Sequence, residues 1–357
     1  MQLERDGDLL KYGIFDWLEH QNIPLHEIFE QRLQMLEQAD RTGFYAYHVA
    51  EHQGTPLSLD SSPSVFLAAA SQRTTKLRLV PTVFCLPWYN PFRLYNEICL
   101  LDNLSKGRVE IGIGRGVSPI ESTYYGITSQ EQGREMFMEA LDVIIRAFKS
   151  DKLDYAGKHH NYEGIELWNK PYQQPYPPLW YPTSNIESVP YVAKEGYSTS
   201  HNFATNEVAK LHIALYKEEL AKNRDNPDRL NGHVSEPLVS NTRHIYIAPT
   251  DEEAVAQATP AFLTWSDHIS HLSGRFSDRP RDSLALQKRM DNGTALVGSP
   301  ETVRTQIQEM VDETGINYFL GVFYFGDLTL DQVLRSMDLF TSKVIGEITT
   351  ASPSVVA

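Results

Sequence analysis

Hydrophobic and polar positions along the chain follow two patterns, one typical of buried strands and one typical of amphipathic helices. Short apolar runs rich in β-branched and aromatic residues predict strands, because a strand buried on both faces needs a nearly continuous apolar sequence. The predicted strands are Lys11–Trp17, Phe44–Val49, Leu77–Phe84, Val109–Ile113, Leu179–Pro182, Tyr197–His201, Arg243–Ile247 and Asn317–Phe323.

Between these runs, apolar residues recur three and four positions apart, which predicts helices with one buried face. The first predicted helix begins at Pro24, where the missing N–H of proline is tolerated, and runs to about Asp40. The other predicted helices are Ser64–Gln72, Arg93–Leu104, Gly133–Phe148, Glu187–Glu195, Glu207–Asn223, Asp251–Phe262, Thr302–Thr314 and Leu330–Ile345.

Two segments depart from this alternation. Asp154–Glu166 is predicted to form a short hairpin. Residues 264–292 are mostly polar and show no clear period. A long irregular stretch in a compact domain is usually functional or mobile, so we interpret 264–292 as a mobile lid insertion.

Alternating strands and helices predict a parallel sheet with helices outside it. Eight such units in 357 residues favour a closed barrel over an open sheet. No break in composition and no internal repeat divides the chain. We therefore expect one α/β domain over residues 1–357, a single (β/α)8 TIM barrel with insertions.

Charge and cysteine content narrow the classes of partner. The chain has 32 basic and 46 acidic residues, a net charge of −14, which opposes binding to nucleic acid or anionic membranes. No run of 18 apolar residues occurs, and the acidic first ten residues do not resemble a secretory signal. Neither Cys85 nor Cys99 has metal-ligand spacing, so we expect core thiols, no metal site and a cytoplasmic protein.

A glycine run, Gly112-Ile-Gly114-Arg-Gly116, ends the fourth predicted strand. It is not a dinucleotide-binding motif, because Val117 occupies the place of the third glycine. Glycines there allow the strand end to approach something closely, either the chain itself or a ligand. In the second case Arg115 offers a fork of donors to a phosphate at the barrel mouth.

Other candidates each have a structural alternative. His52 follows the second strand and could shuttle protons, or could be a satisfied half-buried histidine. Arg134 could reach a phosphate, or could be solvated on its helix. The polar residues after the fifth strand could bind a phosphate, although their residue types alone favour helix capping: Thr183, Ser184, Asn185 and Ser188.

At these positions the chain resembles the bacterial luciferase-like flavin monooxygenases. The similar stretches include GIFDW, AEHQG, LDNLSKGRVEIGIGRG, GREMFMEALDVI, KPYQQPYPPLWYPTSNIESV and VGSPETVRTQI, in the order expected for the family and across most of the chain. The resemblance implies a (β/α)8 barrel that uses reduced flavin and dioxygen. In one branch of the family it implies a deazaflavin that transfers hydride.

The resemblance also implies roles for particular residues. Arg115 and Arg134 match two arginines that contact the flavin phosphate, and the capping interpretation of Asn185, Ser188 and neighbouring Ser184 gives way to phosphate binding. His52 matches the proton-transferring histidine of the luciferase α chain.

Two further positions match the region around the flavin ring. Thr82–Val83 matches a non-prolyl cis peptide behind the ring. Gly114 stands where the luciferase α chain has a reactive cysteine, and Gln53 replaces a second histidine. Light emission is therefore not implied.

The implied activity is a two-component monooxygenase. Reduced FMN from a separate flavin reductase would react with dioxygen to give a C4a-hydroperoxide, which oxygenates a small organic substrate such as an aldehyde or ketone. Two alternatives stay open: hydride transfer by a deazaflavin, and a non-catalytic flavin-binding subunit. The resemblance implies a homodimer, but it does not identify the substrate.

Overall fold

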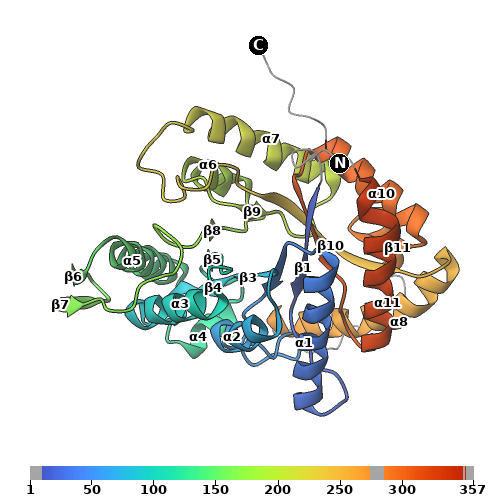
Figure 1. The fold of residues 1–357 in the computed structure, drawn as a ribbon, viewed down its shortest axis with the longest axis horizontal. Coiled ribbons are helices and arrows are strands. Elements are labelled where there is room, and N and C mark those ends of the chain that lie inside the picture. Colours follow the sequence, from blue (N-terminus) through green and yellow to red (C-terminus); the bar gives the residue numbers. More distant parts are fainter. Residues whose placement is uncertain (1–9, 274–284, 349, 351–357) are drawn as a thin grey trace.

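The computed structural model describes residues 10–273, 285–348 and 350. Parallel strands lie inside and helices surround them (Figure 1). The strands are β1 (Lys11–Asp16), β2 (Ala46–Val49), β3 (Arg78–Pro81), β4 (Phe84–Cys85), β5 (Ile111–Gly114), β6 (Lys152–Ala156), β7 (Asn161–Glu166), β8 (Leu179–Trp180), β9 (Thr199–Ser200), β10 (Val239–Ile247), β11 (Ala295–Gly298) and β12 (Tyr318–Val322).

The α-helices mostly occupy the predicted positions. They are α1 (Leu25–Thr42), α2 (Pro63–Arg73), α3 (Pro91–Ser105), α4 (Pro119–Tyr124), α5 (Gln130–Lys149), α6 (Val189–Lys194), α7 (Asn206–Lys222), α8 (Asp251–Ser270), α9 (Ala285–Asp291), α10 (Pro300–Thr314) and α11 (Leu330–Leu339). None of the described helices is long and apolar enough to cross a membrane.

The largest sheet is parallel, with the strand order β11-β10-β12-β1-β2-β3, and β9 also pairs with β10. This sheet forms a half-barrel. A second parallel sheet has the order β4-β5-β8. Single bridges connect the two sheets, Leu79 with Val109 and Trp180 with Ser198. The antiparallel pair β6-β7 confirms the predicted hairpin.

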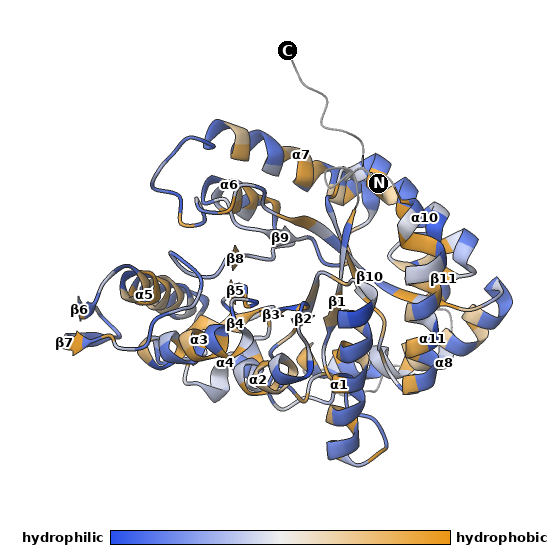
Figure 2. Cartoon of the chain, in the orientation of Figure 1, coloured by the Kyte–Doolittle hydropathy of each residue, from blue (hydrophilic) through white to orange (hydrophobic). Residues whose placement is uncertain are grey.

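Burial explains why the hydrophobic pattern predicts these elements. Every residue of β10 and β12 is buried, as expected for strands with packing on both faces. Helix α5 buries one side, including Ala140, Ile144 and Phe148, and leaves charged residues outside. Figure 2 shows the resulting separation of hydrophobic and hydrophilic residues on the outer helices.

Three differences from the sequence prediction concern short elements. The predicted strand Leu77–Phe84 is two strands, β3 and β4, separated by a cis peptide bond between Thr82 and Val83. Helix α4 and strand β11 are absent from the predicted elements, because six and four residues are too short to show a period.

The prediction that 264–292 is irregular is wrong for most of the residues that the structure describes in this segment. Helix α8 continues to Ser270, because Trp265 extends the buried face formed by Ala258, Ala261 and Phe262. Residues 285–291 form α9. Residues 274–284 lie outside the described residues, and the assignment of a lid to 264–292 stays a prediction. The assignment of a single domain to residues 1–357 also stays a prediction.

The first testable prediction concerns Gly112 in β5. A Cβ atom there would lie 2.1 Å from the carbonyl oxygen of Pro81, a backbone atom that cannot move aside. We expect Gly112→Ala to lower the free energy of unfolding by about 1–3 kcal/mol in urea titrations. Gly346→Ala is the matched control, because nothing lies within 4 Å of its Cβ position. Equal stability of the two variants would contradict the account of this contact.

Candidate active site

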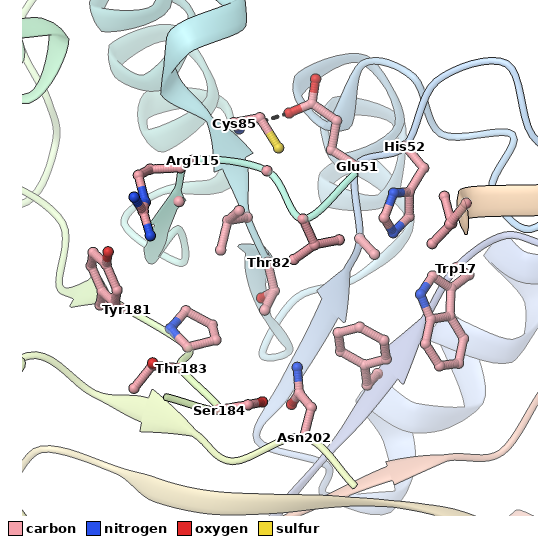
Figure 3. A pocket seen from close by; sticks show the side chains of 18 of the residues that line it. Trp17, Glu51, His52, Thr82, Cys85, Arg115, Tyr181, Thr183, Ser184 and Asn202 are labelled. Atoms are coloured by element: carbon pink, nitrogen blue, oxygen red, sulfur yellow. Dashed lines mark hydrogen bonds between the residues drawn. The ribbon is translucent and has the colours of Figure 1, made fainter. Parts of the chain in front are cut away.

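A cavity of about 460 Å³ lies at the carboxyl ends of the strands. Loops after parallel strands converge at this edge, which is why distant segments meet there. Figure 3 shows Arg115 and Tyr181 on one side of the cavity and His52 and Trp17 on the other, with Thr82 between them. The remaining lining residues include Phe15, Ala50, Glu51, Val83, Cys85, Trp88, Gly114, Gly116, Val117, Asn202, Ile269 and Leu272.

The structure brings together all but one of the residues singled out in the sequence. The candidates that line the cavity are His52, Thr82, Val83, Gly114, Arg115, Thr183, Ser184, Asn185 and Ser188. Arg134 does not line it; this residue is exposed near the start of α5.

One end of the cavity carries positive charge. Burial raises the pKa of Tyr181, while the charge and hydrogen bond of Arg115 and the charge of Arg134 oppose this shift. Both positive charges therefore act on the Tyr181 hydroxyl. Among the residues that the structure describes, neither arginine pairs with a carboxylate. This end is suited to an anionic group.

Polar side chains after β8 face the same end. The Asn185 side chain accepts a hydrogen bond from the backbone N–H of Glu187 at 3.0 Å, so it does cap a turn. Ser188 makes no side-chain capping bond, although it precedes α6. Capping and cavity lining are thus compatible at Asn185, and Ser188 lines the cavity without a capping role.

The cis peptide bond between Thr82 and Val83 borders the middle of the cavity. The Thr82 hydroxyl lies 2.9 Å from Nδ1 of His48, whose Nε2 lies 3.0 Å from the Tyr318 hydroxyl. Burial lowers the pKa of His48 to about 3, so its imidazole is neutral. His48 is a core residue, and its contact with the Thr82 hydroxyl fixes Thr82.

Gly114 approaches the chain itself more closely than the sequence alone indicated. A Cβ atom at this position would lie 2.5 Å from Cγ2 of Val83. Because glycine has no side chain, Val83 can occupy this place at the cavity wall.

His52 is buried at the aromatic end of the cavity, with 8% of its surface exposed. Its Nδ1 atom lies 3.2 and 3.1 Å from the two carboxylate oxygens of Glu121 in α4. Trp17 and Phe15, which pack edge to face, lie on the same side of the cavity.

A family model for luciferase-like monooxygenases matches residues 10–318. The chain belongs to this family. A protein of Sinorhizobium fredii named y4wF, of uncharacterised function, is 33% identical over 341 residues, covering 95% of this chain and 97% of that protein. Limonene 1,2-monooxygenase of Rhodococcus erythropolis is 29% identical over 291 residues, covering 80% and 72% of the two chains.

Solved structures agree on the α/β fold of this luciferase-like protein. The oxygenating constituent of 3,6-diketocamphane monooxygenase from Pseudomonas putida, in complex with FMN, has a TM-score of 0.78 at 21% identity and covers 95% of this chain and 99% of that one. An F420-dependent secondary alcohol dehydrogenase has a TM-score of 0.70 at 19% identity, covering 94% and 98%.

Two cavity residues of the luciferase-like chain were missed as candidates. Glu51 accepts hydrogen bonds from the Cys85 backbone N–H at 3.0 Å and the Tyr89 hydroxyl at 2.8 Å (Figure 3 marks the first). Burial raises the pKa of Glu51 to about 8. Cys85 is a buried thiol, as predicted, but it also lines the cavity, and burial raises its pKa well above the usual value.

The signal for Glu51 was its place beside His52 at a strand end. Cys85 gave no such signal, because a buried thiol in a strand is ordinary. Glu121 lies in the short helix α4 and could not be linked to His52 by sequence spacing.

The second prediction concerns the pH dependence of stability. Folded Glu51 keeps its proton up to pH about 8, whereas in the unfolded chain it releases the proton near its ordinary value of 4.5. The folded state binds more protons between these values, so the free energy of unfolding falls as pH rises from about 4.5 to 8. Glu51→Gln removes this titration and should flatten the pH dependence, measured by urea unfolding.

Asp60 contributes to the pH dependence in the same direction, because burial raises its pKa to about 7. The contribution of Glu51 is therefore the difference between wild type and Glu51→Gln in the slope of unfolding free energy against pH. The exposed Glu207→Gln variant is the control and should keep the wild-type slope. An unchanged slope in Glu51→Gln would refute the neutral, buried state of this carboxyl.

Proposed function

We propose that this family member is the oxygenase of a two-component system, binding reduced FMN in the cavity and using dioxygen to oxygenate a small organic substrate. The observation that carries the proposal is the polarity of the cavity. At one end Arg115 lines the cavity and Arg134 adds positive charge from outside it, neither paired with a carboxylate among the described residues. The other end has aromatic side chains beside a buried histidine. Such a cavity suits a planar aromatic ring with an anionic tail.

The residues at the charged end would hold the cofactor phosphate. Arg115 lines the cavity and supplies charged donors, and Arg134 adds long-range charge. The hydroxyl and amide groups of Ser184, Asn185 and Ser188 provide neutral hydrogen bonds. The backbone at Thr82 and Val83, next to Gly114, would support the ring in the middle of the cavity.

The bound flavin would supply the oxygenating chemistry, through the C4a-hydroperoxide that it forms with dioxygen. In the overall reaction, one oxygen atom enters the substrate and the other leaves as water. Reduced FMN provides the two electrons and leaves oxidised, which is why a separate flavin reductase is needed. The protein contributes position, exclusion of water and proton transfer at His52.

The aromatic end favours an apolar substrate with a carbonyl group, such as a ketone or aldehyde. Trp17 and Phe15 offer ring faces and edges there, while Ile269 and Leu272 add apolar surface. Two relatives, limonene 1,2-monooxygenase and 2,5-diketocamphane 1,2-monooxygenase, are named for compact apolar substrates.

We further propose that the strands close into a complete barrel and that two chains form a dimer. The two bridges that connect the parallel sheets support a closed eight-stranded barrel within one domain. Exposed apolar side chains on α2 and α3, including Val65, Leu100 and Leu104, support a homodimer through these helices.

Hydride transfer with a deazaflavin is the second candidate, favoured by the structural likeness to an F420-dependent dehydrogenase. Oxygen uptake separates the two candidates. We expect oxygen consumption with chemically reduced FMN and cyclic ketones or monoterpenes, and product that contains ¹⁸O from ¹⁸O₂. Tight deazaflavin binding with no ¹⁸O in the product would overturn the proposal, and absence of both activities would favour a non-catalytic flavin-binding subunit.

The third prediction tests the phosphate end. Arg115→Ala removes charged hydrogen bonds and should weaken FMN binding by about ten- to a hundredfold, measured by fluorescence titration. Riboflavin has no phosphate and should bind both proteins equally. Equal losses for FMN and riboflavin would place Arg115 away from the phosphate.

The fourth prediction tests His52. His52→Ala should reduce turnover about a hundredfold or more while FMN affinity changes less than about twofold, because proton transfer is lost and the phosphate contacts remain. The exposed His26→Ala variant is the control. Normal turnover of His52→Ala in the oxygen-uptake assay would refute the assigned role.

A further inference from the structure

The contact between His52 and Glu121 joins two loops that are far apart in the sequence. His52 follows β2, and Glu121 lies in α4, beyond β5. Glu121 has only 2% of its surface exposed, and both of its oxygens lie within hydrogen-bonding distance of Nδ1 of His52, at 3.2 and 3.1 Å. A buried carboxylate that faces one ring nitrogen with both oxygens controls the protonation of that nitrogen.

The carboxyl group of Glu121 has a second partner besides His52. Oxygen Oε1 of Glu121 also accepts the backbone N–H of Gln53 at 2.5 Å. With Glu121 as the carboxylate, Nδ1 of His52 carries the proton and donates it. In the neutral imidazole, Nε2 then keeps its lone pair.

The position of Glu121 is set by α4 and its surroundings. Ser118 caps this helix by accepting the backbone N–H of Glu121, and its hydroxyl donates to the carbonyl of Leu272 at 2.9 Å. Leu272 itself lines the cavity. The short helix is therefore fixed against the cavity wall, and Glu121 is presented to His52 without contacting the cavity, since it is absent from the lining residues.

We propose that Glu121 is a positioning residue that holds His52 in the tautomer with the proton on Nδ1, so that Nε2 is the proton acceptor of the active site. The catalytic consequence rests on the proposed function, whereas the tautomer does not. When Nε2 takes a proton from a group in the cavity, Nδ1 keeps its own proton, and the imidazolium formed lies beside the negative charge of Glu121. The same pair returns the proton when the product forms.

The chain offers variants that separate this role from a structural one. In Glu121→Gln the amide oxygen can still accept the Gln53 N–H, while the amide nitrogen donates to Nδ1 of His52 and so moves the ring proton to Nε2. Glu121→Asp keeps the carboxylate. Ser118→Ala removes the cap of α4 and the bond to Leu272 but leaves the carboxylate facing His52.

The experiment records ¹⁵N shifts of histidine-labelled protein without flavin, with the His52 signal assigned from its loss in His52→Asn. We expect the Nδ1-protonated tautomer in the wild type, Glu121→Asp and Ser118→Ala, and the Nε2-protonated tautomer in Glu121→Gln. The same His52 tautomer in the wild type and Glu121→Gln would overturn the proposal.

Turnover of the reduced-FMN reaction gives the second measurement. Glu121→Gln should lower turnover at least about tenfold with FMN affinity and thermal unfolding unchanged, Glu121→Asp should recover part of the loss, and the pH profile should change only in Glu121→Gln. Equal losses in Ser118→Ala and Glu121→Gln would show a structural role and overturn the proposal. If the wild type does not consume oxygen, the proposed function fails, while the tautomer result still decides the inference.

Discussion

The close approach of β5 to the backbone between β3 and β4 is the constraint on which the site depends. Gly112 lies against the Pro81 carbonyl, and Gly114 lies against Val83, at distances that no Cβ atom would permit. This contact places Thr82 and Val83 at the cavity wall, and it brings the segment after β5, with Arg115, to the same edge. His48 secures the other side by its contact with the Thr82 hydroxyl.

The cavity is positively charged at one end and neutral elsewhere, which suits a flavin. Positive side chains gather at one end in a protein whose net charge is −14, so this end is a local exception to an acidic surface. Elsewhere in the cavity, burial keeps ionisable groups neutral: it raises the pKa values of Glu51 and Cys85. The lining therefore offers charge to a phosphate and a low-polarity environment to a ring and substrate.

Much of the frame could be predicted from the sequence, because buried parallel strands leave continuous apolar runs and their loops meet at one edge. The strands around β10 and β12 and the convergence of His52, Arg115 and Ser188 follow from this rule. What could not be predicted depends on three-dimensional contacts. Glu121 meets His52 across 69 residues of sequence, and the period of α8 beyond Phe262 is hidden among polar positions.

The central claim is that the cavity holds FMN with its phosphate at Arg115 and its ring beside Thr82 and Val83. A crystal structure of the protein with FMN tests this most directly. We expect phosphate oxygens about 3 Å from the Arg115 guanidinium and from donors in the segment after β8, with the ring reaching toward His52. A phosphate at the Trp17 end, or FMN bound outside the cavity, would contradict it.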